Sequence, residues 1–125
     1  MNQTFPKSIR VFRKHGHTIY WGNAIEVLCS HVDDRSIDFI FADAPYNIDK
    51  LFANFTDKWA SDDEYAEWCY SWIDLCVEKL TSSGSMYVMA STQSMSYIEL
   101  YLRKQLTILS RIVWRYDSSG VQSRK

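Results

Sequence analysis

The hydrophobic positions along the chain change their spacing several times, and the changes predict strands that alternate with helices. Short apolar runs typical of strands lie at residues 17–21, 37–42, 85–90 and 106–116. Helices are predicted at residues 24–28, 61–80 and 93–104. This alternation predicts an α/β fold with a parallel sheet, equivalent to half of a doubly wound sheet.

The longest predicted helix has a clear start and a clear apolar side. Ser61 and Glu64 have the spacing of a capping box, in which two side chains satisfy free backbone amides of the first turn. The apolar side consists of Tyr65, Trp68, Cys69, Trp72, Ile73, Cys76 and Leu80. This side should lie on the sheet, with its two cysteines as buried free thiols. Residues 81–84 should end the helix, with Gly84 as the C-terminal cap.

The most hydrophobic strand, residues 37–42, should be buried on both faces of the sheet. A loop follows it, from Asp43 to about Ala60. In a doubly wound sheet, ligands bind at the carboxyl ends of the strands. The start of this loop is therefore the place where we expect the chemistry.

Composition narrows the class of protein. A chain of 125 residues with 46% hydrophobic residues has the size of one ordered domain. Its apolar runs are too short for a transmembrane helix, and its first residues lack the pattern of a signal peptide, so we expect a cytoplasmic protein without membrane contact. The two ends are basic and the middle is acidic. A solvated surface and a surface that faces a phosphate backbone both explain this distribution.

Histidine and cysteine do not form a recognisable metal-binding pattern. Cys29 lies near His31, and His15 lies near His17. Neither pair belongs to a C-x-x-C or H-E-x-x-H pattern, on which a zinc prediction would rest. We expect no metal site.

The most informative residues stand at the start of the predicted loop and are Asp43, Ala44, Pro45 and Tyr46. Aspartate and proline favour turns, so an ordinary turn is one interpretation. The four residues also resemble the D/N/S-P-P-Y/F motif of DNA methyltransferases that modify the exocyclic amine of adenine (N6) or cytosine (N4). Further segments are similar to that family at the expected distances: residues 21–28, 47–48, 84–89 and 112–114.

The resemblance implies a role for each residue of the motif. Asp43 would accept a hydrogen bond from the target amine, and the backbone carbonyl of Ala44 would accept a second. Such acceptors pull the weakly nucleophilic nitrogen toward tetrahedral geometry and favour the transition state. Pro45 would stiffen the loop, and Tyr46 would stack on a base flipped out of the duplex.

The resemblance also implies the reactants. The methyl donor would be S-adenosylmethionine and the partner double-stranded DNA, as in restriction-modification enzymes. Aspartate at the first motif position favours adenine as the target. The chain departs from the family at Ala44, where the family has proline. Alanine keeps the carbonyl and loses the fixed φ, so we expect a less preorganised loop with its chemistry retained.

Two other positions have open interpretations. The family carries an aspartate near the adenine of the cofactor where this chain has Asn23. Asn23 keeps an oxygen acceptor without the charge, so a cofactor contact and a simple turn residue both fit. Residues 117–120 follow the last predicted strand, and they fit either a loop that lines the DNA side or a plain loop.

The family holds the methyl donor with a glycine-rich turn, and the four glycines here, at 16, 22, 84 and 120, are too far apart to form one. In the β arrangement of the family, that turn and the target-recognition region follow the catalytic motif. The resemblance therefore implies that residues 1–125 are the N-terminal part of the catalytic domain, with an incomplete Rossmann-like doubly wound sheet. Related glutamine and guanine methyltransferases place the turn before the motif, which speaks against both.

Two hypotheses follow for the function. The first is an adenine-N6 DNA methyltransferase ended early by truncation, frameshift or gene splitting. The second is a non-catalytic remnant, or an assembly partner whose separate C-terminal half is another chain. Under either hypothesis we expect the 125-residue chain alone to bind S-adenosylmethionine weakly or not at all.

Overall fold

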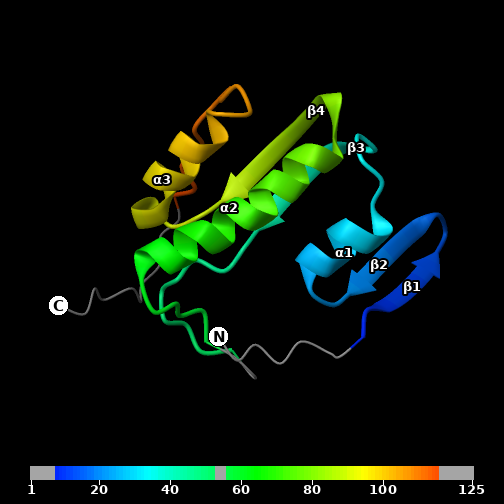
Figure 1. Cartoon of the computed structure of the whole chain (residues 1–125), viewed down its shortest axis with the longest axis horizontal. Helices are drawn as coiled ribbons and strands as arrows, with labels where there is room; N and C mark the ends of the chain where they lie inside the picture. The colour runs from blue at the N-terminus through cyan, green and yellow to red at the C-terminus, as the bar shows by residue number, and fades with distance from the viewer. Residues whose placement is uncertain (1–7, 53–55, 116–125) are drawn as a thin grey trace.

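The computed structural model describes residues 8–52 and 56–115. This part of the chain contains the elements β1, β2, α1, β3, α2, β4 and α3 in that order (Figure 1). Strands β1 and β2 form an antiparallel sheet, and β3 and β4 form a separate parallel sheet. The predicted mixed α/β class is confirmed.

A β-hairpin opens the described part of the chain. Strand β1 (Arg10–Lys14) pairs with β2 (His17–Trp21) through a turn at His15 and Gly16. Both turn residues have a positive φ, 50° and 78°, as a tight two-residue hairpin turn requires. The predicted strand at 17–21 is confirmed. Its partner was not predicted, because three of the five residues of β1 are basic and hide the strand pattern.

The first helix, α1 (Ala24–His31), begins where the sequence predicts it. The side-chain oxygen of Asn23 caps the helix by accepting a hydrogen bond from the backbone amide of Ile25 at 2.9 Å. Ile25 and Leu28 of α1 pack against the hydrophobic core.

A strand–helix–strand unit forms the centre of the molecule. Strand β3 (Ile37–Asp43) leads through a loop to α2 (Asp62–Lys79), which is followed directly by β4 (Leu80–Met89). The two strands are parallel, and their register ends with Asp43 opposite Met89. In Figure 1, α2 runs along this strand pair. The β1–β2 hairpin lies beside α1, on the side of the molecule away from α3. The loop after Asp43 therefore starts at the carboxyl edge of a parallel sheet.

Helix α2 confirms the predicted start and apolar side. The Ser61 hydroxyl accepts from the Glu64 amide at 3.1 Å, and the Glu64 carboxylate accepts from the amide of Ala60 at 2.9 Å. The second bond reaches one residue further back than in a standard capping box. The buried core consists of Trp59, Tyr65, Cys69, Trp72, Ile73, Cys76, Ile98 and Leu102. The prediction that both helix cysteines are buried free thiols is confirmed.

Helix α2 ends at Lys79, next to the predicted end, but the predicted C-terminal cap at Gly84 is wrong. Gly84 lies inside β4 beside a register shift in the pairing with β3. A side chain at position 84 would meet the Leu80 side chain at 2.9 Å and the carbonyl oxygen of Ile37 at 3.0 Å. The glycine therefore permits a close approach between the strands instead of capping the helix.

The prediction that residues 37–42 are buried on both faces is also wrong for the described chain. Side chains alternate along a strand, and Ile40 and Ala42 face the core beneath α2 and α3. The intervening Phe39 and Phe41 are 58% and 57% exposed. They point to the opposite face of the sheet, which no described helix covers.

Helix α3 (Thr92–Leu102) confirms the third predicted helix. The strand predicted at 106–116 does not form in residues 106–115, because no described strand lies beside them to pair with. Leu106 and Ile108 of this stretch pack against the core, whereas four later apolar side chains are exposed: Leu109, Ile112, Val113 and Trp114. Arg111 forms an ion pair with Glu99 of α3. In the part of the chain that is described, the parallel sheet thus consists of the β3–β4 pair.

Candidate active site

The candidate site begins at the end of β3. Asp43 is the last residue of the strand and is exposed, and the loop that follows connects β3 with α2. A carboxylate at this place lies at the carboxyl edge of the parallel pair, where open α/β sheets bind their ligands.

Two of the predicted catalytic side chains lie together. The hydroxyl of Tyr46 donates a hydrogen bond of 2.6 Å to Oδ1 of Asp43. This hydrogen bond, with smaller contributions from burial and from the Asp43 charge, raises the pKa of Tyr46 to about 12. The Asp43 carboxylate is therefore placed to accept a hydrogen bond at the start of the loop.

The two residues between them are held by the core. Ala44 is half-buried and packs against the hydrophobic cluster. The carbonyl of Pro45 accepts a hydrogen bond of 2.7 Å from the hydroxyl of Tyr65, a residue of α2 that is 1% exposed. Burial raises the pKa of Tyr65 well above its ordinary value, so its hydroxyl remains a donor. The structure therefore brings all four motif residues into one ordered loop.

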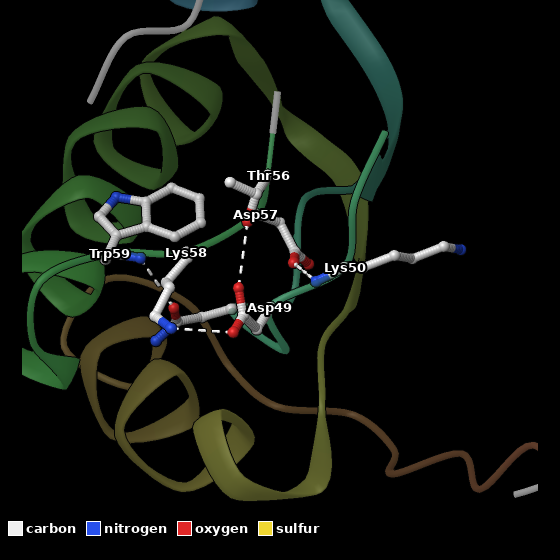
Figure 2. A network of polar contacts seen from close by, with 7 residues as sticks. Asp49, Lys50, Thr56, Asp57, Lys58 and Trp59 are labelled. Carbon is white, nitrogen blue, oxygen red and sulfur yellow. Dashed lines mark hydrogen bonds and ion pairs between the residues drawn. The ribbon is translucent and has the colours of Figure 1, made fainter. Parts of the chain in front are cut away.

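Asp57 anchors the same loop, and sequence reasoning missed it. Its side chain is 2% exposed, and its two carboxylate oxygens accept from the backbone amides of Tyr46 at 3.3 Å and Lys50 at 2.5 Å. Figure 2 shows the Asp57 carboxylate facing the amide of Lys50. Aspartate is common in loops, so the sequence offers no local signal that this carboxylate is buried.

Asn47 connects the loop to the start of α2. It has a left-handed φ of 57°, a conformation that asparagine tolerates better than most residues. Its side-chain oxygen accepts from the amide of Trp59 at 3.0 Å, and its side-chain nitrogen donates to Asp62 at 3.3 Å. Asn47 therefore holds the segments on either side of the loop together.

The outer side of the loop carries a separate ion pair. Asp49 is exposed and binds the ammonium of Lys58 at 2.8 Å and the hydroxyl of Thr56 at 3.3 Å (Figure 2). The hydrogen bond from Lys58 holds the pKa of Asp49 below its ordinary value. Exposed pairs of this kind contribute little to stability.

Asn23, the predicted cofactor contact, lies at the start of α1. None of the hydrogen bonds found for Asn23 reaches residues 43–46, since its side-chain oxygen is used to cap α1. Residues 117–120, which were predicted to follow the last strand, lie outside the described residues.

The cysteines and histidines form no site in the described chain. Burial raises the pKa of Cys69 and of Cys76 to about 11, so neither thiol is ionised at neutral pH. In residues 8–52 and 56–115, no group of three or more potential ligands of the His, Cys, Asp or Glu type could hold a metal ion. Within the same ranges no helix has both the length and the apolar character to cross a membrane.

Comparison with known proteins places this geometry in a family. Residues 37–125 match the family model described as DNA methylase. The chain is 45% identical over 114 residues to DNA adenine methyltransferase YhdJ of Escherichia coli (strain K12), which covers 91% of this chain and 38% of that protein. It is 37% identical to the type II methyltransferase M.BamHI of Bacillus amyloliquefaciens, with 70% of this chain and 21% of that protein covered.

A third relative shows the same partial coverage. The chain is 32% identical over 104 residues to the type II methyltransferase M.HpaI of Haemophilus parainfluenzae, which covers 82% of this chain and 32% of that protein. The chain thus spans well under half the length of these curated relatives. The matched segments include the loop that carries Asp43 and Tyr46.

Proposed function

Because this chain belongs to the DNA methylase family, we propose that it carries the base-binding half of an active site that transfers a methyl group to the N6 amine of adenine in DNA. The observation that carries the proposal is the pairing of Asp43 with Tyr46 at the carboxyl edge of the β3–β4 pair. This pairing supports the proposal because it brings a hydrogen-bond acceptor and an aromatic ring together at that edge.

Asp43 acts on the amine through a hydrogen bond. An aromatic amine donates its lone pair into the ring and is therefore a poor nucleophile. A carboxylate that accepts one amine hydrogen draws the nitrogen toward tetrahedral geometry, in which the lone pair is free to attack. The Tyr46 hydroxyl donates to Oδ1 of this carboxylate at 2.6 Å, and because a carboxylate accepts several hydrogen bonds, a base amine can bind it beside the hydroxyl or in its place.

Tyr46 provides the surface on which a flipped base stacks. Extrusion of a base from the duplex costs a few kcal/mol of pairing and stacking, and a ring in the pocket recovers part of it. Base–aromatic stacking contributes about 1–3 kcal/mol for each base. Ala44, between the two, supplies a backbone carbonyl for the second amine hydrogen in the proposed complex. Adenine is preferred because the relative at 45% identity is named a DNA adenine methyltransferase.

The described residues fit the base better than the methyl donor. S-adenosylmethionine supplies the methyl group in the proposed reaction. The candidate contact for it, Asn23, already uses its side-chain oxygen to cap α1. The chain's four glycines lie at 16, 22, 84 and 120, too far apart for a glycine-rich turn.

The proposed fold is a Rossmann-like doubly wound sheet of which the chain supplies a part. The β3–α2–β4 unit is the building block of such sheets, and this supports the proposal. We further propose that residues 1–125 are part of the catalytic domain and that the glycine-rich and target-recognition segments are provided elsewhere. Double-stranded DNA is the proposed partner, together with a separate C-terminal half in a split enzyme.

One observation favours a second candidate, a non-catalytic assembly partner. The sheet face opposite α2 carries large exposed side chains, namely Phe39, Phe41 and Tyr87. An apolar face of this kind is normally covered by another element or another chain. An assembly role that uses this face would not need the chemistry of Asp43.

The experiment that separates the candidates is a chimaera of the Escherichia coli relative in which this chain replaces the 114-residue segment it resembles. With Asp43→Ala, methyl transfer should fall by about a hundredfold or more, as for the loss of a well-placed acceptor in other enzymes. Binding of S-adenosylmethionine should stay unchanged. Asp49→Ala, in the same loop, removes an exposed carboxylate and should leave transfer intact. Full transfer by the Asp43→Ala chimaera would refute the proposal.

A further inference from the structure

We propose that Asp57 is a positioning residue for the catalytic loop, fixing the loop backbone where this chain has Ala44 in place of the first proline of the family motif. The inference rests on the proposed function, which gives the loop its catalytic role. Its test needs neither DNA nor methyl donor. Asp57 lies eleven residues beyond Tyr46 in the sequence, in a segment that runs back toward the loop.

The first observation is the burial and pairing of the carboxylate. Asp57 is 2% exposed, and each of its two oxygens accepts one backbone amide, that of Tyr46 or that of Lys50. A buried carboxylate is tolerated only when its oxygens are hydrogen-bonded. Backbone amides four residues apart thus converge on one side chain, and the intervening loop is held at both ends.

The second observation is that one peptide unit is held on both of its polar groups. In the peptide bond between Pro45 and Tyr46, the carbonyl accepts from the Tyr65 hydroxyl at 2.7 Å. The amide of the same bond donates to Asp57 at 3.3 Å. A peptide plane held on both edges cannot rotate without breaking a hydrogen bond. The direction of the Tyr46 side chain toward Asp43 depends on that plane.

The third observation is the closure of the segment between Lys50 and Asp57. The Asp57 amide donates to the Lys50 carbonyl at 3.1 Å, while the Asp57 carboxylate accepts from the Lys50 amide. A bridge between Leu51 and Thr56 lies directly inside this reciprocal pair. Asp57 is therefore tied to Lys50 through both its backbone and its side chain, which keeps the carboxylate beside the loop.

These contacts compensate for the departure at Ala44. Proline fixes φ through its ring, whereas alanine at position 44 lacks that constraint and is restricted only by the proline that follows it. Side-chain bonds from Asp57 and Tyr65 restrict the next peptide unit instead. Asp57 touches only the backbone of the loop, so its role is to position Asp43 and Tyr46 and not to act on the base.

The test measures hydrogen exchange at individual amides of the full 125-residue chain by NMR. In Asp57→Asn, a carboxamide keeps one acceptor oxygen and presents an NH₂ group to the other amide. We expect the amide of Tyr46 or Lys50 to lose protection by about tenfold or more, the factor that corresponds to about 1.4 kcal/mol. Amides in the middle of α2 should keep their protection. The chemical shift of Tyr46 Cζ should move as its bond to Asp43 weakens.

Asp49→Asn is the matched control. It makes the same change of charge in the same loop, but Asp49 bonds only the side chains of Lys58 and Thr56. Protection at Tyr46 and Lys50 should therefore stay as in the unmodified chain. If Asp57→Asn does not fold, Tyr65→Phe removes the hydroxyl on the Pro45 carbonyl and keeps the packed ring. It should lower protection at Tyr46 alone.

A double variant tests the compensation. In the background of Ala44→Pro, Asp57→Asn should cost Tyr46 less protection than it does with alanine at position 44. Unchanged protection at both loop amides in Asp57→Asn would overturn the proposal. So would an equal loss of protection across α2 and the loop, because that would indicate global destabilisation. Either result would leave the proposed methyl transfer untouched, since the Asp43→Ala chimaera tests that separately.

Discussion

At the scale of single residues, the hydroxyl of Tyr46 has two consequences for Asp43. It donates a hydrogen bond to Oδ1 of the exposed carboxylate, and in the proposed complex it competes with a base amine for that oxygen. The ring of Tyr46 and its hydroxyl therefore have separable roles, one favourable and one competitive. Substitutions that divide the ring from the hydroxyl test this separation.

The effect of replacing Tyr46 on methyl transfer and DNA binding should depend on whether the aromatic ring is kept. In the chimaera, Tyr46→Phe keeps the stacking surface and frees Asp43, so methyl transfer should stay within a few-fold of the unmodified chimaera. Tyr46→Ala removes the ring and should weaken binding of target DNA by about 1–3 kcal/mol. Titration with DNA that carries 2-aminopurine at the target position measures this difference. Equal binding by both variants would exclude the stacking role.

The acid–base behaviour of Tyr46 should report its contact with Asp43. The hydrogen bond to Asp43 is the largest reason why the pKa of Tyr46 lies at about 12, and the neighbouring negative charge acts in the same direction. Asp43→Asn removes that charge, so the Tyr46 pKa should fall toward its ordinary value near 10. NMR titration of Tyr46 Cζ follows it, with Asp49→Asn as the control. A Tyr46 pKa that stays near 12 in Asp43→Asn would contradict the contact.

At the scale of elements, the pattern of the sequence predicts those parts that local forces determine. The start of α2 depends on Ser61 and Glu64, which act within one turn, and its apolar side follows from spacing alone. The strand that carries Asp43 was predicted from its apolar run for a similar reason. The motif residues were found because a resemblance names them, and the structure then shows Asp43 and Tyr46 in contact.

The predictions that were wrong or missing concern residues whose roles depend on neighbours distant in sequence. Glycine is common as a helix cap, yet Gly84 lies in space against Leu80 and Ile37, and this close contact determines its role. Asp57 looks like a loop residue, and only the folded chain shows that it bonds Tyr46. Strand pairing for residues 106–115 requires a neighbouring strand, which a local pattern cannot supply.

Gly84→Ala tests the account of the strand–helix junction. The added methyl group would lie 2.9 Å from the end of the Leu80 side chain and 3.1 Å from the Thr81 carbonyl oxygen, so the side chain must move and the strand must adjust slightly. We expect a loss of about 1–3 kcal/mol in the free energy of unfolding, measured by urea titration. Ser82→Ala, at an exposed position of the same strand, should change it by less than about 0.5 kcal/mol. A stable Gly84→Ala variant would show that the junction is not close-packed.

At the scale of the whole molecule, the chain combines the proposed catalytic loop with a sheet face that no described element covers. The loop is held by Asp57, Asn47 and the core, whereas the sheet face with Phe39 and Phe41 is open among the described residues. The base-binding loop and the donor-binding parts therefore differ in how completely this chain provides them.

Donor binding should reflect this difference. We expect calorimetry with the 125-residue chain alone to detect weak binding of S-adenosylmethionine or none. The chimaera, which adds the rest of the Escherichia coli relative, should bind it with an affinity close to that of the relative. Tight one-to-one binding by the chain alone would show that residues outside the described ranges, or Asn23, complete a donor site.

The identity of the methylated atom tests the central claim most directly. DNA incubated with the chimaera and S-adenosylmethionine can be digested to nucleosides and analysed by mass spectrometry, with the Asp43→Ala chimaera as the control. We predict N6-methyladenine that disappears in the control, because Asp43 and the carbonyl of Ala44 act on an exocyclic amine. A folded chimaera that binds the donor and leaves the amines unmethylated, or that still forms N6-methyladenine with alanine at position 43, would contradict it.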